Sequence, residues 1–218
     1  MKNKLKILAY LMMMFVSYQS ASLFAADNKA EEIIKKVKNE YDDLKTFYAD
    51  FTQTSYWKLA DNVHEQKGKI WLKGKDKFKI ETDDQTVVSD GKTIWTYSKF
   101  NNQVIIDKVE KSGEEIRLPK DIFFKYSEDY NPIYIKDEKI DNQDCSVLEL
   151  KAKTEDIFIK YMKIWINRKI SIPVKIEQTD INNNSNNYLI SNIEINKAID
   201  DNFFVYKVPE SVEIIDMR

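Results

Sequence analysis

The chain offers few side chains that could perform catalysis. His64 is the sole histidine of the 218 residues, and Glu65 is its direct neighbour in the chain, where it cannot orient the imidazole as a catalytic triad requires. Cys145 is the sole cysteine and follows Asp144 in a strand-like stretch, which favours a small buried side chain over a nucleophile. We therefore expect a protein that is not an enzyme.

Three pairs of adjacent acidic residues are the remaining groups that could bind a metal ion or exchange a proton. Each pair lies at an expected turn or helix end, and none has the spacing of a calcium-binding loop. The pairs are Asp42 with Asp43, Asp83 with Asp84, and Asp200 with Asp201. We interpret them as solvated turn residues and expect no metal and no cofactor.

Residues 1–26 have the layout of a secretory signal peptide. Three lysines precede an apolar run from Ile7 to Val16, and small residues follow up to Ala26. The run is shorter than the roughly 20 apolar residues that cross a bilayer. We expect cleavage after Ala25 or Ala26 and, because no cysteine lies near this site, a mature protein without a lipid anchor.

Residues 27–218 suit a single domain with one core. Loss of the three signal-peptide lysines lowers the formal charge from −2 to −5, and no basic stripe is present, so nucleic acid is not an expected partner. A single cysteine excludes an intramolecular disulfide. Burial alone must therefore hold the domain together.

The residue pattern predicts one helix followed by strands. Asn28 precedes Glu31 by three residues, as in a capping box, and apolar residues from Ala30 to Leu44 recur at helical spacing. From Phe47 onward, apolar and polar residues alternate, which indicates a continuous antiparallel meander. The expected strands cover residues 47–52, 70–72, 77–82, 87–97 with a hairpin turn at Asp90 and Gly91, 102–109, 132–137, 144–153, 157–167, 172–180, 187–196 and 203–208.

Two segments suggest that the sheet is covered. Residues 112–126 interrupt the alternation and favour one or two short helices broken at Pro119. The strand 157–167 is apolar on both sides, with Ile157, Ile159, Tyr161 and Trp165 on one side and Phe158, Met162, Ile164 and Ile166 on the other. Either helices cover one side and the curvature of the sheet closes the other, or one side is a hollow that accepts lipid.

One hairpin and several shorter pieces form a specific series. The hairpin from Ser89 to Tyr97 reads Ser-Asp-Gly-Lys-Thr-Ile-Trp-Thr-Tyr and is its most specific member. The other pieces are Phe47–Gln53, Trp71–Lys73, Phe78, Gln103–Val104 and Phe203–Val212. In this order, after a signal peptide and an opening helix, they resemble the periplasmic outer-membrane lipoprotein carrier family, LolA.

The resemblance implies a mainly β fold with α cover: an unclosed antiparallel β-barrel of about eleven strands, with a helical lid over a hydrophobic cavity. It implies a periplasmic carrier that binds the acyl chains of lipoproteins and ferries them from the inner to the outer membrane. The implied partners are the acylated lipoprotein cargo, an inner-membrane ATP-driven lipoprotein-releasing complex, and an outer-membrane acceptor if one is present. We expect a monomer.

The resemblance also points to residues. Phe78 falls at a phenylalanine of the family pattern, which implies that it lines or gates the cavity. The other lipid-binding candidates, from the strands and the expected lid, are Phe51, Trp71, Ile80, Trp95, Tyr97, Ile122, Phe123 and Phe124. Core packing remains the alternative for each of these aromatic residues, because strands are enriched in aromatic side chains and the pattern does not say which face is concave.

Gly74 departs from the family pattern. Where the family reads Trp-x-Lys-Arg-Pro, this chain reads Trp71-Leu72-Lys73-Gly74-Lys75, so the arginine that holds the lid is missing. Lys73 or Lys75 are the candidates to interact with the lid instead, although an ammonium lacks the fork of a guanidinium. Two other functions stay open: a carrier of another lipid or glycolipid, and a lipoprotein-sensing module of an envelope-stress regulator.

Overall fold

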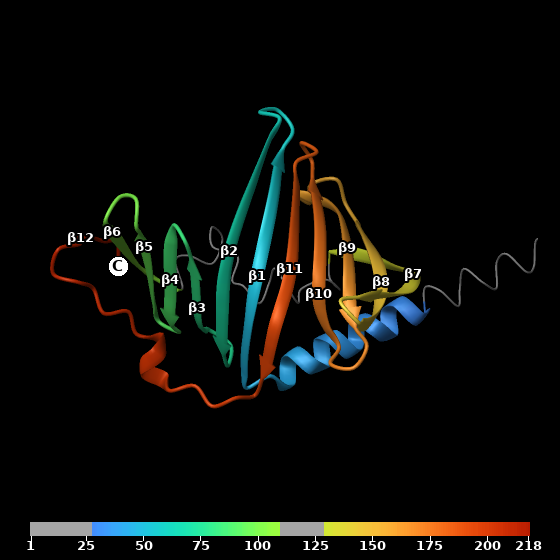
Figure 1. Ribbon diagram of the computed structural model, residues 1–218, viewed down its shortest axis with the longest axis horizontal. Helices are drawn as coiled ribbons and strands as arrows, with labels where there is room; N and C mark the ends of the chain where they lie inside the picture. The colour runs from blue at the N-terminus through green and yellow to red at the C-terminus, as the bar shows by residue number, and fades with distance from the viewer. Residues whose placement is uncertain (1–27, 110–128) are drawn as a thin grey trace, which may run out of the picture.

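The computed structural model describes residues 28–109 and 129–218 (Figure 1). Within them, an α-helix over residues 28–43 precedes twelve strands that form a single unclosed sheet. The predicted fold class, a mainly β open barrel with α cover, is therefore confirmed, with twelve strands in place of about eleven. The signal peptide expected over residues 1–26 and the helical lid expected over 112–126 lie outside the described residues.

Strands account for most of the described chain. In sequence order they are β1 (Thr46–Trp57), β2 (Asn62–Lys73), β3 (Lys77–Thr82), β4 (Gln85–Asp90), β5 (Thr93–Ser98), β6 (Gln103–Lys108), β7 (Tyr130–Ile140), β8 (Gln143–Ala152), β9 (Ile159–Asn167), β10 (Ile172–Asp180), β11 (Ser185–Ile195) and β12 (Glu213–Asp216).

The sheet order differs from the predicted continuous meander. It runs β12-β6-β5-β4-β3-β2-β1-β11-β10-β9-β8-β7, so two meanders, β1–β6 and β7–β11, join through β1 and β11. These two long strands match their apolar residues across the pair, with Phe47 opposite Ile195 and Phe51 opposite Ile190. β12 also breaks the pattern, because it pairs with β6 in parallel. Alternation predicts strands but carries no information on partners so far apart in the chain.

The strand predicted over residues 203–208 is wrong. The segment begins with the 3-10 helix η1 (Asp201–Phe204) and continues as an irregular tail. The Asp200 carboxylate accepts a hydrogen bond from the Asn202 N–H at 2.8 Å and caps this turn. This local side-chain bond outweighs the alternation of Phe203 and Val205, as aspartate at a helix N-terminus commonly does.

The main core lies on one face of the sheet, here called the inner face, and the helix packs on it. Ala30, Ile34 and Val37 of the helix are buried in this core, as the helical spacing predicts. The strands contribute cross-strand rows of apolar residues. One row is Phe47, Leu72 and Phe78 from β1, β2 and β3, and the next is Ala49, Ile70, Ile80 and Val87 from β1 to β4.

The opposite, outer face carries two smaller cores. The C-terminal tail forms one of them by packing on β5 and β6, where Val104, Ile106 and Val212 are buried with Trp95, Tyr97, Tyr206 and Val208 around them. The other joins Cys145, Val147, Trp165 and Val174. Burial of Cys145, predicted from its surroundings, is confirmed, and that burial raises the pKa of its thiol.

The strand predicted over residues 157–167 is apolar on both faces, as expected, but two details differ. β9 begins at Ile159, and Ile159 packs in the inner core and not on the side of Trp165. The reason is a bulge in β9, where Ile159 and Tyr161 face the consecutive residues Asp180 and Thr179 of β10. Trp165 lies on the outer face. Its indole N–H donates to Glu138 at 3.0 Å, and the Lys175 ammonium lies 4.3 Å from the ring centroid. Side chains of the sheet itself therefore close this outer surface.

Candidate functional site

The inner face carries apolar surface that the main core does not fully bury. Ile80 and Val87 are half-buried, face each other across β3 and β4, and pack on the edge of that core. Phe51, also half-buried, lies one row further along β1. We call Phe51, Ile80 and Val87 the inner patch. It is one of the places on the described inner face where an apolar ligand finds partly exposed aliphatic and aromatic side chains.

The ring of Phe51 lies against a glycine. Gly68 lies directly opposite Phe51, and a Cβ added to Gly68 would come within 2.5 Å of the Phe51 Cζ and 2.6 Å of the Glu81 carbonyl oxygen. No side chain fits there without displacing the ring and the backbone. The glycine therefore fixes where the aromatic ring lies on the inner face.

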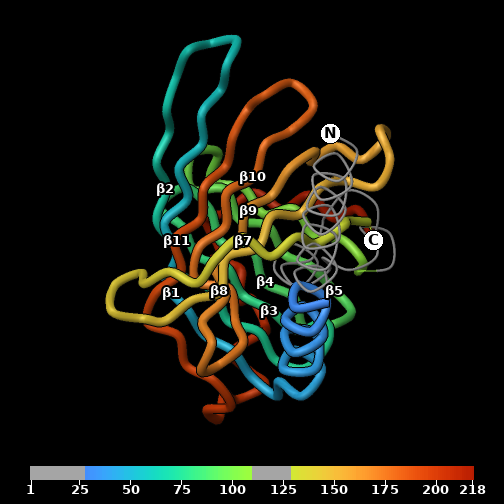
Figure 2. Tube along the Cα trace, turned by 90° about the vertical axis from the view of Figure 1, so that its right-hand side faces the viewer, coloured from blue at the N-terminus to red at the C-terminus, as the bar shows by residue number. Residues whose placement is uncertain are grey.

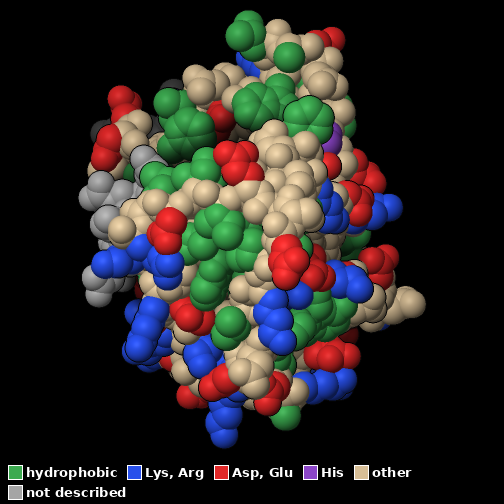
Figure 3. All heavy atoms as spheres, turned by 90° about the vertical axis from the view of Figure 1, so that its left-hand side faces the viewer, with side chains coloured by type: hydrophobic (Ala, Val, Ile, Leu, Met, Phe, Trp, Pro, Cys, Tyr) green, Lys and Arg blue, Asp and Glu red, His purple; other side chains and the backbone are tan. Residues whose placement is uncertain are grey.

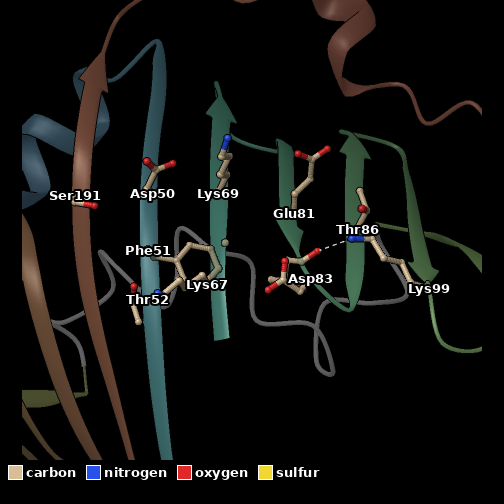
Figure 4. Close-up of a pocket in the computed structure, with 12 residues that line it drawn as sticks. Asp50, Phe51, Thr52, Lys67, Lys69, Glu81, Asp83, Thr86, Lys99 and Ser191 are labelled. Carbon is tan, nitrogen blue, oxygen red and sulfur yellow. Dashed lines mark hydrogen bonds between the residues drawn. The ribbon is translucent and has the colours of Figure 1, made fainter. Parts of the chain in front are cut away.

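A hollow of about 620 Å³ extends across β11, β1, β2, β3 and β4 (Figure 4). Phe51 and Gly68 contribute to its wall, and the Lys99 ammonium in the wall donates to the Thr82 carbonyl at 3.1 Å. Much of the remaining lining is one cross-strand row of polar residues, formed by Ser191, Asp50, Lys69, Glu81 and Thr86. This row belongs to the outer face, because its members alternate along the strands with Phe51 and Ile80 of the inner face. The hollow is thus largely polar and charged, and apolar only at Phe51.

Asp50 in this lining is ordered by hydrogen bonds on both sides. The Asn192 amide donates to one carboxylate oxygen at 2.7 Å and the Tyr48 hydroxyl donates to the other at 2.5 Å. These bonds, that of Asn192 most, lower the pKa of Asp50, while the bond to Asp50 raises the pKa of Tyr48 to about 12. Asp50 therefore stays ionised and is suited to orienting polar groups, not to transferring protons near neutral pH.

The residues predicted to bind lipid do not all meet. Phe78 is 3% exposed and belongs to the main inner core, while Phe51 and Ile80 lie on the inner patch. Trp71, Trp95 and Tyr97 lie on the outer face, so they do not share a surface with Phe51 and Ile80. Ile122, Phe123 and Phe124 lie outside the described residues. Lipid binding by any of these residues stays a prediction.

Trp71 illustrates what the outer aromatic residues contact. Its ring lies 5.2 Å from that of Tyr48 and 5.3 Å from that of Phe203 in η1. The Lys79 ammonium lies 4.6 Å from the centroid of Phe203, over the same cluster. Tyr97 stacks on Tyr206 of the tail with ring centroids 6.1 Å apart. These residues hold the C-terminal tail against the sheet.

Lys73, a candidate for holding the lid, binds the C-terminal segment. Its ammonium donates to the Ile199 carbonyl at 2.5 Å and lies 2.7 Å from the Asp201 carboxylate, which also pairs with Lys77 at 3.0 Å. Hydrogen bonds from Lys73 and Lys77 lower the pKa of Asp201. The sequence showed Asp201 only as a turn residue, because its partners lie more than a hundred positions away.

Lys75 and Gly74 form the exposed turn between β2 and β3. Gly74 has a φ of +60°, a conformation that glycine adopts without strain, and its N–H donates to the Lys45 carbonyl at 3.0 Å. A Cβ added at this position would meet no heavy atom within 4 Å. The turn geometry thus accounts for the glycine. A role of Lys73 or Lys75 toward the expected lid stays a prediction.

The described residues offer neither a metal site nor a membrane-spanning helix. Neither stretch, 28–109 or 129–218, contains three or more histidine, cysteine, aspartate or glutamate side chains grouped so that they could hold a metal ion. The described helices also include none that is both long and apolar enough to cross a membrane.

An open sheet with a helix on its apolar inner face is an unclosed half-barrel with a helical cover. The family model described as outer membrane lipoprotein carrier protein LolA matches residues 42–207. The chain belongs to this family, which is a family of carriers, and the resemblance seen in the sequence is confirmed.

Relatives with this description cover most of the chain. An outer-membrane lipoprotein carrier protein of Actinobacillus succinogenes is 27% identical over 203 residues, covering 91% of this chain and 90% of its own length. That of Histophilus somni is 25% identical over 188 residues, covering 85% and 88%. An uncharacterized protein of Methanocaldococcus jannaschii, MJ0687, is 27% identical over 190 residues, and the chain spans about half, 53%, of its length.

Solved structures show the same fold at low sequence identity. An uncharacterized conserved protein from Thermus thermophilus superposes with a TM-score of 0.58 at 11% identity, covering 86% of this chain and 99% of its own. The Mycobacterium tuberculosis lipoprotein LppX gives a TM-score of 0.51 at 11% identity, covering 80% and 98%. At such identities the likeness concerns the fold alone.

Proposed function

We propose that this protein is a periplasmic carrier that binds the acyl chains of lipoproteins and ferries them from the inner to the outer membrane. The observation that carries this proposal is the family match over residues 42–207. In the proposed arrangement, residues 1–26 are a cleaved signal peptide and residues 27–218 are one carrier domain. The carrier works without forming or breaking covalent bonds.

The chemistry of the cargo explains why such a carrier needs an apolar surface. Each methylene removed from water contributes about 0.8 kcal/mol, so an acylated protein stays in its membrane or aggregates unless another apolar site receives it. The inner patch offers Phe51, Ile80 and Val87, which pack on the edge of the main core. An acyl chain that binds there would extend this apolar contact. A patch of modest area also permits release, because the bound chain must leave again at its destination.

The proposal includes partners at both ends of the route. An inner-membrane ATP-driven releasing complex would supply the energy for extracting the lipoprotein. An outer-membrane acceptor, if present, would receive it through tighter binding. The relatives from Histophilus somni and Actinobacillus succinogenes, described as outer-membrane lipoprotein carriers, support this placement.

A release assay with spheroplasts tests the proposal. Spheroplasts that contain a radiolabelled lipoprotein are incubated with the purified protein, and the soluble fraction is analysed for a one-to-one complex. Ile80→Gln places an amide on the inner patch and should reduce the released lipoprotein about tenfold, since a buried polar group without partners is costly. Leu189→Gln is the matched control, because Leu189 of β11 is exposed on the outer face.

The outcomes separate the proposed carrier from its alternatives. Release by the wild type and by Leu189→Gln, with loss in a folded Ile80→Gln variant, supports the proposal. Absence of any released acylated protein, combined with free lipid or glycolipid found by mass spectrometry of the purified protein, would contradict it in favour of a carrier of that lipid. Lipoprotein binding without release from the membrane would favour the sensing function.

A further inference from the structure

Exposed apolar side chains gather at one end of the sheet. Trp57, Leu59 and Val63 lie at the tip of the β1–β2 hairpin, where Leu59 is 102% exposed and Trp57 is 57% exposed. Ile181 in the β10–β11 turn and Phe158 in the β8–β9 loop are also exposed. We call these five residues the apolar rim. Figures 1 and 2 show that all three tips project from the same end of the molecule.

Hydrogen bonds join the three tips into one surface. The Lys58 N–H donates to the Asn184 side-chain oxygen at 3.1 Å, which links the β1–β2 tip to the β10–β11 turn. The Ile181 N–H donates to the Phe158 carbonyl at 3.0 Å, which links that turn to the β8–β9 loop. The rim residues are therefore neighbours in space, although they come from three separate parts of the chain.

The tips are also held in shape while they present these side chains. The Tyr56 hydroxyl donates to Asp61 at 3.1 Å across the β1–β2 tip. In the β10–β11 turn, the Asp180 carboxylate accepts from the Asn182 and Asn184 N–H groups at 2.8 and 2.9 Å. An apolar surface that is ordered before it meets a partner loses little conformational freedom when it binds.

The other end of the sheet is different. Its turns are polar or charged, as at Lys75 with Asp76, Asp141 with Asn142, and Arg168 with Lys169. None of the large exposed apolar residues in the described ranges lies in these turns. Figure 3 shows the same polarity, with acidic and basic side chains crowding the lower part of the view and hydrophobic ones reaching the top. The apolar end is thus a property of one end of the fold and not of its loops in general.

We propose that the apolar rim docks on the surface of a lipid bilayer. The rim consists of hairpin tips that project from one end of the sheet (Figures 1 and 2), a shape that a fluid interface can follow. Tryptophan, phenylalanine and leucine are side chains that enter the boundary between headgroups and acyl chains. Lys58 is exposed between Trp57 and Leu59, where its ammonium can pair with a lipid phosphate once these side chains enter the interface.

This inference goes beyond the proposed carrier function, since it concerns binding to membranes that contain no lipoprotein. It assigns the rim to contact at the start and end of transport, when cargo must cross between a bilayer and the protein. A side chain such as Leu59, which contacts little of its own protein, then becomes buried at the membrane surface.

Flotation with protein-free vesicles tests the docking surface. The purified protein, in the form in which cells accumulate it, is mixed with vesicles of phosphatidylethanolamine and phosphatidylglycerol, and the floated fraction is measured against lipid concentration. Leu59→Ser should weaken vesicle binding about tenfold, and Trp57→Ser by a similar factor. Val205→Ser is the matched control, because Val205 is an exposed apolar residue of the tail outside the rim. It should bind as the wild type does.

The results distinguish the rim from the carrier site. Equal flotation of the wild type and Leu59→Ser, or no flotation of the wild type, would overturn the bilayer inference. Binding to native membranes that trypsin treatment of those membranes abolishes would overturn it as well, because a protein would then be the occupant. Uptake of detergent-solubilised lipoprotein, measured separately, should be the same in Leu59→Ser and wild type. Its loss in both would contradict the carrier proposal without affecting the rim.

Discussion

The two faces of the β2–β6 hairpins use neighbouring residues of the same sequence block in different ways. On the inner face, Phe78 is buried under the main core and Ile80 reaches its partly exposed edge. On the outer face, Trp71, Trp95 and Tyr97 contact the C-terminal tail and η1. The aromatic residues that seemed to form one wall in the sequence therefore belong to two surfaces with separate covers.

This difference shows which aromatic residues are available to a ligand. The outer residues are already engaged by residues 203–212, so an apolar ligand would have to displace the tail to reach them. Among the residues that the structure describes, the inner patch retains exposed surface without any such displacement. The comparison also implies that the two faces can be destabilised separately. A substitution of Phe78 would destabilise the inner core, and a substitution in the tail would destabilise the outer cover.

The largest effect is expected from Phe78→Ala. Phe78 is 3% exposed in the main core, and removing a buried phenyl ring lowers the free energy of unfolding by about 3–5 kcal/mol. Urea denaturation followed by circular dichroism measures this loss. A charged residue at this position should prevent folding, which makes it unsuitable for separating transfer from stability. A shift of the midpoint no larger than that of an exposed substitution would instead place Phe78 at the surface as a gate.

The corresponding change on the outer face is Phe204→Ala. Phe204 is fully buried in η1, which lies against β3 and β4, so truncation should cost about 3 kcal/mol. Because the tail is a separate cover, the loss should appear as local opening: proteolysis after Lys207 accelerates, while the amides of β1, β2 and β11 stay protected from hydrogen exchange. Faster exchange in these central strands as well would show that the covers are not independent.

A smaller effect is expected from Gly68→Ala, which acts on the inner face without removing any contact. The added methyl would overlap the Phe51 ring and the Glu81 carbonyl, and overpacking of this kind costs about 1–3 kcal/mol. Urea denaturation measures the change, with Gly74→Ala as a comparison in which the cost is conformational and not steric. A wild-type midpoint for Gly68→Ala would mean that the ring does not rest on this glycine in solution.

The sequence predicted the elements well and their surroundings poorly. Alternation located most strands, and the capping pattern near Asn28 located the helix, because both signals are local. The faces could not be assigned from the sequence. The alternation shows that Phe78 and Trp71 lie on different faces of the sheet, but which face receives the helix depends on packing between distant segments. The bulge that turns Ile159 inward and the bond of Lys73 to Asp201 also depend on tertiary contacts, which no local pattern encodes.

The smallest expected effect is a pH dependence of the outer cover, which depends on the ionisation of Asp201. The pKa of Asp201 is lowered by its bonds from Lys73 and Lys77, so its ionised form holds the tail. That contribution is present above the ordinary value of 3.8 and is lost as the pH falls through the lower value in the folded protein. Tryptophan fluorescence, which reports on Trp71 under η1, should therefore change below about pH 4 in the wild type.

In Asp201→Asn the change in fluorescence should be present already at neutral pH, and the change on acidification should be absent. Glu210→Gln, an exposed carboxylate in the same tail, is the control and should retain the wild-type change on acidification. If the fluorescence change on acidification were as large in Asp201→Asn as in the wild type, other carboxylates would control the release of the tail. The aromatic contacts, and not Asp201, would then hold the tail at neutral pH.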